Sequence, residues 1–343
     1  MPRQVSAVLS RPSLTEHAAS EILERVWGIH GALSGLPSER DRNFRVEVDD
    51  RPSFVLKFAN LAEDREFLEL QHRSLACLRE AGLPVQQVVP ATDGAELVES
   101  AIDGERTLAR VLTWLPGVPL ATVRPEARRQ ALLEDLGHTM GTVARSLATT
   151  DAGAARRSFQ WDVLRFEDVV DVHARAVTDV ARQRVLRRAR ERLGRTLVPV
   201  LGDLPRSLIH NDANDHNVLV DAAADRLTGL LDLGDMVESA TANEAAVAAA
   251  YAMLGAPWPL DVLEAVARGF HAARPLARLE IVALPELVLA RLCTSVVLSA
   301  HQARLDPADA YLSVSEGPAW DLLERLLAVD PAPAVSRLRG ARR

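Results

Sequence analysis

The chain has 343 residues, of which 48% are hydrophobic and 25% are charged, so it is long enough for two lobes with a large core. Its net charge of −7 provides no basic field, and neither nucleic acid nor a membrane is expected as a partner. The first residues lack the apolar core of a signal peptide, and the most apolar stretch, 284–300, is interrupted by Glu286 and Arg291. With Cys77 and Cys293 expected as separate buried thiols, the sequence predicts a cytoplasmic protein.

The N-terminal third is predicted to contain two helices and an antiparallel sheet. Apolar residues at helical spacing predict helices over 14–27 and 61–81, and three glycines after the first helix are expected to break the pattern. Alternating segments on either side of Asp49 and Asp50 predict a hairpin with Lys57 in its second strand. Three further predicted strands, 85–90, 95–101 and 106–112, make five in all. Neither G-x-G-x-x-G nor a P-loop motif occurs, so neither a dinucleotide-binding fold nor a P-loop is supported.

From residue 124 onward, helical patterns dominate and surround one short hairpin. The segment 182–195 has seven arginines and one glutamate, which indicates a solvated helix face, with an RNA-binding or acid-binding surface as the alternative. Residues 331–343 are rich in Pro, Ala and Arg without periodicity, and they are predicted to form a flexible tail.

The hairpin carries the most informative motif of the chain. His210, Asp212 and Asn217 spell H-x-D-x-x-x-x-N and lead into an apolar strand, and a second strand ends in the D-x-G of Asp232 and Gly234. Pairing of the two strands would bring Asn217 close to Asp232. Phosphoryl transfer needs such a group, because one carboxylate orients the attacking hydroxyl while an amide oxygen and a second carboxylate hold Mg²⁺ against nucleotide phosphates. We therefore expect Asp212 to be the catalytic base, and Asn217 and Asp232 to be magnesium ligands.

Three other interpretations account for parts of this stretch. A polar surface turn without chemistry is disfavoured by the strand-loop-strand context. A metal-dependent hydrolase could use His210, Asp212, Asp215, His216 and Asp232 as ligands, although such sites usually need additional histidines. A kinase fold that binds nucleotide without catalysis is disfavoured because Lys57, Asp212, Asn217 and Asp232 are all present.

The segment HNDANDHNVLV, followed by LLDLGDM, resembles the aminoglycoside phosphotransferase family of small-molecule kinases. Within that family it is most similar to hydroxylysine kinases and to the kinase-like modules fused to class III aminotransferases. The resemblance implies an α+β, bilobal, protein-kinase-like fold. Residues 1–113 would form a nucleotide-binding lobe with an antiparallel sheet, and residues 114–330 a mainly helical lobe with the substrate pocket. It also implies Mg²⁺ and ATP, or GTP, with which hydroxylysine kinases are associated.

The same resemblance suggests further site residues. Lys57 would pair with the α- and β-phosphates, and His210 would pin the catalytic loop through its ring. Gln71 stands where relatives usually place the glutamate that orients the lysine, with Glu66 and Glu69 as alternatives. The remaining expected nucleotide-binding residues are Ser38 and Asn43, in a turn over the phosphates, and Thr113 and Trp114, in the hinge beside the adenine edge.

The expected acceptor follows from the charge around the motif. Four acids lie near Asp212 in the sequence or are expected near it in the fold, namely Asp215, Asp235, Glu238 and Glu244. Their field would suit a cationic amine beside the reacting hydroxyl. The predicted substrate is therefore a small hydroxylated amino acid or amino alcohol such as hydroxylysine, with an aminoglycoside as the alternative.

Overall fold

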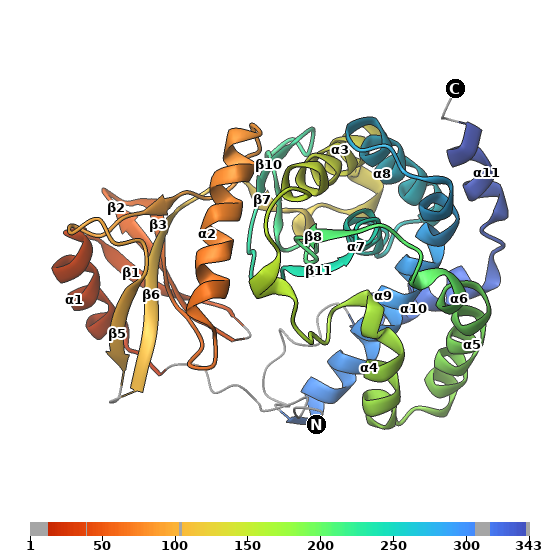
Figure 1. The fold of residues 1–343 in the computed structure, drawn as a ribbon, viewed down its shortest axis with the longest axis horizontal. Coiled ribbons are helices and arrows are strands. Elements are labelled where there is room, and N and C mark those ends of the chain that lie inside the picture. The colour runs from red at the N-terminus through yellow and green to blue at the C-terminus, as the bar shows by residue number, and fades with distance from the viewer. Residues whose placement is uncertain (1–12, 39, 103–104, 306–315, 341–343) are drawn as a thin grey trace. The chain divides into compact units, whose positions relative to one another are not determined.

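The computed structural model describes residues 13–38, 40–102, 105–305 and 316–340 (Figure 1). The chain divides into two compact units: the first contains Met1–Glu80 and Pro84–Leu115, and the second contains Ala81–Leu83 and Pro116–Arg343. The first is built on an antiparallel sheet, and the second is mainly helical. The predicted α+β class is therefore confirmed.

The sheet of the first unit has six strands among the described residues, in the order β1-β2-β3-β6-β4, with β5 also paired to β6. The prediction of five strands was wrong because the glycine-rich segment after the first helix forms β1. A Cβ on Gly31 would lie 2.5 Å from the Glu47 carbonyl oxygen, so this glycine permits close strand approach instead of ending structure. The strands are β1 (Ala32–Leu36), β2 (Arg42–Val48), β3 (Arg51–Phe58), β4 (Val88–Val89), β5 (Val98–Ile102) and β6 (Glu105–Thr113).

Helices α1 (Glu16–Trp27) and α2 (Arg65–Glu80) lie on opposite faces of this sheet (Figure 1). Side chains alternate between the faces along a strand, so Leu56 and Phe58 of β3 point to the same side. Both belong to the apolar cluster that includes Leu23 of α1. Lys57, between them, therefore points to the α2 side.

The second unit contains nine α-helices and two small sheets among the described residues. One sheet pairs β10 with β9 and β9 with β7, and the other pairs β11 with β8. The helices are α3 (Gln130–Leu147), α4 (Phe166–His173), α5 (Val180–Thr196), α6 (Val198–Leu201), α7 (Asn243–Ala252), α8 (Pro259–Ala273), α9 (Arg278–Leu305), α10 (Glu316–Ala328) and α11 (Ala332–Gly340). The strands are β7 (Val118–Pro119), β8 (Arg206–Ile209), β9 (Val218–Val220), β10 (Leu227–Leu230) and β11 (Val237–Ala240).

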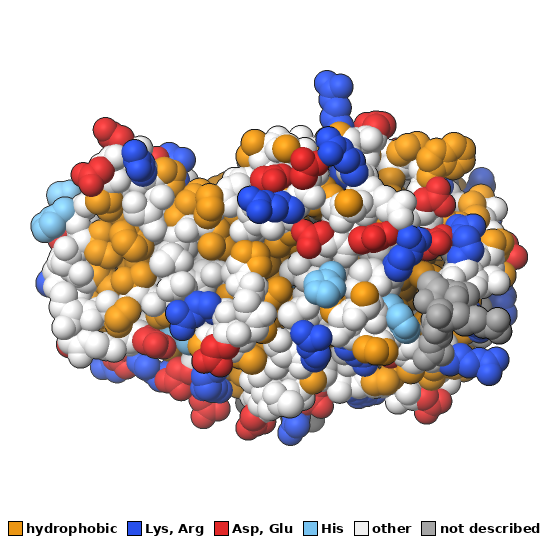
Figure 2. Space-filling view, turned by 90° about the horizontal axis from the view of Figure 1, so that it is seen from above, with side chains coloured by type: hydrophobic (Ala, Val, Ile, Leu, Met, Phe, Trp, Pro, Cys, Tyr) orange, Lys and Arg blue, Asp and Glu red, His pale blue; other side chains and the backbone are white. Residues whose placement is uncertain are grey.

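Helix α9 is the core helix of this unit. Its 28 residues are long and apolar enough to cross a membrane by length and composition alone, but 89% of its most apolar window is buried against other parts of the protein. Helices α4, α5, α7 and α10 pack against it. The arginines of α5 contribute to this packing: Arg192 binds Glu286 of α9 at 2.6 Å, and Arg182 binds Glu316 of α10 at 2.7 Å. Acidic and basic side chains are interspersed on the face shown in Figure 2.

The prediction of a flexible tail over 331–343 was wrong for 332–340, which form α11. The Asp330 carboxylate accepts a hydrogen bond from the Ala332 N–H, and Val335 and Leu338 are buried. Helix α11 packs against α8 and α9. A short helix of this kind depends on tertiary burial, which a local pattern does not reveal. Residues 341–343 lie outside the described part of the chain.

Helices α3 and α8 approach each other closely through paired glycines. A Cβ on Gly137 would lie 1.9 Å from the Val266 carbonyl oxygen, and one on Gly269 would lie 1.9 Å from the Glu134 carbonyl oxygen. Both contacts are with backbone atoms, so no side-chain rotation can relieve them.

We expect Gly269→Ala to lower the free energy of unfolding by about 1–3 kcal/mol, because the two helices must move apart. Gly194→Ala in α5 is the matched control, since an added Cβ meets nothing within 4 Å there. Alanine also favours helix over glycine, so the control should be neutral or stabilising by up to about 1 kcal/mol. Urea unfolding of the two variants measures both effects, and equal stabilities would contradict the close-packing argument.

Candidate active site

Three buried polar side chains form a row across the first sheet. Asn43 of β2 is directly opposite Lys57 of β3, and Lys57 is directly opposite Arg110 of β6. Directly opposed residues point to the same face of an antiparallel sheet. Because Arg110 donates a hydrogen bond to Gln71 of α2 at 2.7 Å, the row faces α2. Two cations side by side on one face of a sheet form a positive surface of the kind that binds phosphate groups.

A carboxylate from outside the helix lies beside Lys57. The Lys57 ammonium lies 3.9 Å from the Asp41 carboxylate, in the loop before β2, and Asp41 also accepts a hydrogen bond from the Asn60 N–H. The Gln71 side chain accepts a hydrogen bond from Arg110. Glu69 pairs with Arg65, and Glu66 is exposed. Sequence analysis missed Arg110, although strand register would have placed it beside Lys57.

The other expected nucleotide-binding residues have local roles. The Ser38 hydroxyl accepts a hydrogen bond from the Asp41 N–H, and thus holds the turn that carries Asp41. The side-chain oxygen of Asn43, Oδ1, is buried without a hydrogen-bond partner among the described residues. The Thr113 N–H donates to the Gln87 carbonyl and the Trp114 N–H donates to the Ser53 carbonyl. Base recognition by either N–H would require exchange of that bond.

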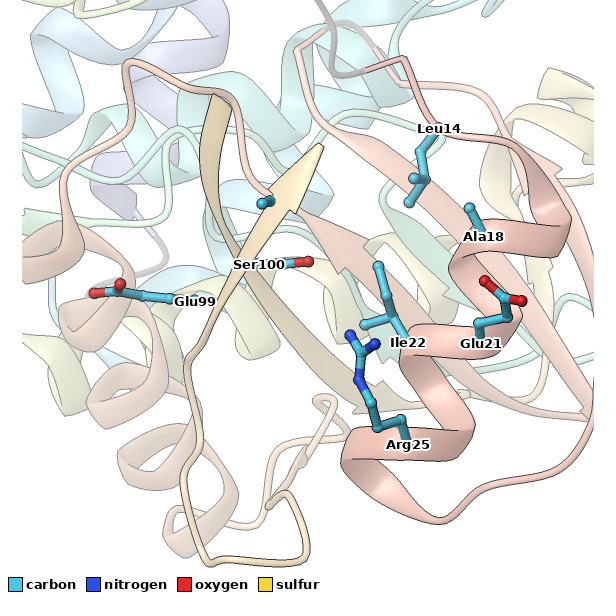
Figure 3. Close-up of a pocket in the computed structure, with 8 residues that line it drawn as sticks. Leu14, Ala18, Glu21, Ile22, Arg25, Glu99 and Ser100 are labelled. Carbon is cyan, nitrogen blue, oxygen red and sulfur yellow. The ribbon is translucent and has the colours of Figure 1, made fainter. Parts of the chain in front are cut away.

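A hollow in the first unit lies away from this row. It is lined by Leu14, Ala18 and Ile22 near or on α1 and by Ser100 of β5 (Figure 3). It is therefore on the α1 side of the sheet, whereas Lys57 points to the α2 side.

In the second unit, the loop 210–217 holds Asp212 by a set of short-range bonds. Asn217 donates to one Asp212 carboxylate oxygen at 2.7 Å, and Asn214 donates to the other at 3.0 Å. Asn211 adopts a left-handed conformation (φ 66°) that bends the chain ahead of Asp212. Burial, and next the charge of Asp235, raise the pKa of Asp212 well above its usual range. A carboxylate of raised pKa accepts a proton more readily, as a general base must.

His210 is fully buried and engages backbone groups with both ring nitrogens. Nδ1 accepts the Asp212 N–H at 3.1 Å, and Nε2 donates to the Leu231 carbonyl at 3.0 Å. This pattern requires a neutral ring protonated on Nε2, and burial lowers the His210 pKa accordingly. A metal-ligand role for His210, as in the hydrolase alternative, would require it to break one of these bonds.

Asn217 and Asp232 lie at adjacent ends of the hairpin, as their spacing suggested. The Leu231 N–H donates to the Asn217 carbonyl at 2.8 Å, which joins the residue before Asp232 directly to Asn217. The Asn217 side chain uses its NH₂ group to bind Asp212. Its side-chain oxygen, Oδ1, therefore remains available to a metal. Asp232 has φ 58° and accepts the Gly234 N–H. One amide oxygen and one carboxylate are hard ligands that suit Mg²⁺, which takes its remaining ligands from phosphates and water.

The four acids expected around the acceptor have different environments. Glu244 is fully buried on α7 and accepts the N–H groups of His210 and Asn211, so its predicted contact with substrate was wrong. Glu238 pairs with Arg156. Burial raises the pKa of Asp215, whose backbone carbonyl binds the Ala121 N–H. Asp235 is the one of the four whose charge acts on Asp212.

Sequence analysis missed one cation beside the base. Arg291 of α9 lies 3.3 Å from the Asp212 carboxylate, and its guanidinium group lies over the Trp161 ring at 4.4 Å. The signal for it in the sequence is an arginine inside the long apolar segment 284–300.

A sequence profile described as the phosphotransferase enzyme family (APH) matches residues 32–280. The chain belongs to this family. It is therefore a phosphotransferase, and a small-molecule kinase by its class. The resemblance noted from the catalytic motif is confirmed.

This APH phosphotransferase has similar proteins across nearly its whole length. It is 27% identical to hydroxylysine kinase of Mus musculus, over 94% of this chain and 91% of the relative. A solved microcompartment-associated aminopropanol kinase has a TM-score of 0.68 at 18% identity, over 90% of this chain and 97% of that one. A GDP complex of aminoglycoside 2'-phosphotransferase-IIIa has a TM-score of 0.61 at 16% identity, over 91% and 98%. At these identities the two structures show the shared fold.

The buried Glu244 carboxylate should make the stability of this phosphotransferase depend on pH. Burial raises its pKa from 4.5 to about 7, so folding favours the neutral form. Its stabilising contribution is complete below the unfolded pKa and is lost as the pH rises through about 7. From about pH 5 to about pH 8, this group should lower the free energy of unfolding by on the order of 2 kcal/mol.

Urea unfolding without nucleotide or magnesium, across that pH range, measures this loss. Glu244→Gln should flatten the profile, whereas Glu191→Gln, at an exposed position of α5, should leave it unchanged. An identical slope in wild type and Glu244→Gln would contradict the argument.

Proposed function

We propose that this phosphotransferase moves the γ-phosphate of ATP or GTP to a hydroxyl of a small cationic amine, either a hydroxylated amino acid or an amino alcohol such as hydroxylysine. The observation that carries the proposal is the Asp212 carboxylate, held by two amide side chains on a loop whose end is bonded to the Asp232 strand. This arrangement provides a base and two oxygen ligands in one small volume of the second unit.

Each group has a distinct part in the proposed reaction. Asp212 accepts the proton of the acceptor hydroxyl while the hydroxyl oxygen bonds to phosphorus and the bond to the leaving nucleotide breaks. Asn217 and Asp232 would hold Mg²⁺, which when bound neutralises charge on the phosphate oxygens. Lys57 and Arg110 supply positive charge for phosphate groups in the first unit. Most of the rate comes from positioning and charge neutralisation.

The acceptor class is supported by charge and by similarity. Asp235 is buried close enough for its charge to act on Asp212, so an ammonium group next to the reacting hydroxyl would be stabilised. The names of the mouse relative and of the aminopropanol kinase both denote enzymes whose acceptors combine an amine with a hydroxyl. The similarity to the mouse enzyme covers most of both chains, which supports an acceptor of that kind.

We expect Asp212→Ala and Asp212→Asn to lower kcat by about 10²–10⁴-fold, because no carboxylate then takes the proton of the substrate hydroxyl. Nucleotide affinity should stay near the wild-type value, as measured by calorimetric titration with a nonhydrolysable analogue. Asp203→Asn, at an exposed position before β8, is the control and should retain full activity. Wild-type turnover in either Asp212 variant would remove Asp212 from the mechanism.

A matched acceptor screen tests the substrate class with ATP and with GTP. We expect hydroxylysine or 1-amino-2-propanol to be phosphorylated, as detected by nucleoside diphosphate release and by phosphorus NMR of the product. Propan-2-ol, which lacks only the amine, should be inert because it gains nothing from Asp235. Aminoglycosides are tested as acceptors in the same screen. Preference for propan-2-ol or neutral sugars would refute the charge argument, and turnover of aminoglycosides alone would favour the alternative acceptor. Absence of transfer to every acceptor would favour a non-catalytic nucleotide-binding module.

A further inference from the structure

Arg291 connects the catalytic base to the core of the second unit. It lies within α9, is 3% exposed, and directs Nη2 to an Asp212 carboxylate oxygen at 3.3 Å. In the part of the chain that the structure describes, Asp212 is the acid with which Arg291 forms an ion pair. A buried arginine is stable only with a counter-charge, so the two side chains depend on each other.

Two aromatic residues hold the guanidinium group in place. It lies 4.4 Å from the ring centroid of Trp161 and 5.5 Å from that of Tyr251. Nη2 also donates to the Tyr251 hydroxyl at 3.4 Å, and Nη1 donates to the Trp161 carbonyl at 3.4 Å. Tyr251 belongs to α7 and Trp161 to the segment that precedes α4. With the Asp212 loop, three separate elements therefore contact this one planar cation.

We propose that Arg291 is the positioning residue for the Asp212 carboxylate, and that it holds the oxygens of the base in the orientation that accepts the substrate proton. The proposal rests on Asp212 acting as the base in the proposed function. Asn214 and Asn217, which also donate to the carboxylate, belong to the same loop as Asp212. They can set the carboxylate relative to the loop, whereas Arg291 sets it relative to a core helix.

The shape of the guanidinium group matters for this role. It can lie over the Trp161 ring and donate in its plane to Asp212 at the same time, whereas a lysine ammonium offers a point charge without a plane. Lysine should therefore preserve the charge but lose the orientation. Arg291 takes no proton itself: the proton moves from the acceptor hydroxyl to Asp212, the new O–P bond forms, and the bond from phosphorus to the nucleoside diphosphate breaks. A misplaced base can reduce the rate about 10²-fold.

The test compares Arg291→Lys and Arg291→Gln with Arg187→Gln, an exposed arginine of α5 that serves as the control. The acceptor is whichever compound the wild-type enzyme phosphorylates, so failure of the proposed acceptor appears in the wild type and failure of this inference appears only in the variant-to-wild-type ratio. We expect kcat to fall about 10²-fold in both Arg291 variants, with KM for nucleotide and acceptor unchanged. Added guanidinium ion should restore part of the activity of Arg291→Ala, because it can take the place of the missing side-chain group.

A double-mutant cycle with Asp212→Asn separates positioning from general loss of structure. In that background, Arg291→Lys should cause little further loss of kcat, since the carboxylate that it positions is gone. Additive losses would overturn the proposal. So would a rise in acceptor KM at constant kcat, which would mean that Arg291 binds the acceptor, or wild-type kcat in Arg291→Gln. If Arg291→Gln fails to fold, Tyr251→Phe provides the same comparison, and we expect a smaller fall in kcat. An unchanged kcat in Tyr251→Phe would overturn the proposal that the held Arg291 side chain positions Asp212.

Discussion

The imidazole of His210 is the interaction on which the catalytic loop depends. Through its two nitrogens it joins the Asp212 backbone to the carbonyl of Leu231, the residue before Asp232. The Leu231 N–H in turn binds Asn217. One neutral ring and one backbone hydrogen bond thus set the spacing of the base and of both metal-ligand candidates. Because the ring is fully buried, its pKa is lowered and it stays neutral. It therefore adds no positive charge beside Asp212 and Asp232.

The polar groups around the site are supported by partners deep in the core. In the second unit, Glu244 binds the backbone at the start of the loop and Arg291 binds the base. Each is a buried group that would be unfavourable alone and is stable because of a specific partner. In the second unit, helices α7 and α9 therefore contribute to the geometry of the loop directly, through side chains that reach it from the interior. The site is consequently sensitive to how these helices pack.

The parts of the site that sequence could predict are those governed by short-range pairing. Asn217 and Asp232 flank one hairpin, so their proximity followed from two strands and a turn. The bond between Gln71 and Arg110 joins residues 39 positions apart, and that between Arg291 and Asp212 joins residues 79 apart. No periodicity specifies which of several polar residues will meet across such distances. The same limit applies to β1 and α11, because the partner strand and the packing helices determine whether those short segments fold.

The structure also changes the electrostatic argument about the acceptor. Four acids beside the base would favour a polycation, but Glu238 is paired with Arg156, and Glu244 is engaged with the backbone. Arg291 adds a buried positive charge at the base itself. The charges that raise the pKa of Asp212 come from Asp235 and, more weakly, from Asp232. Acidic charge next to one guanidinium group suits the proposed acceptor, an ammonium beside the reacting hydroxyl, whereas an ammonium placed against Arg291 would be repelled in a poorly screened interior.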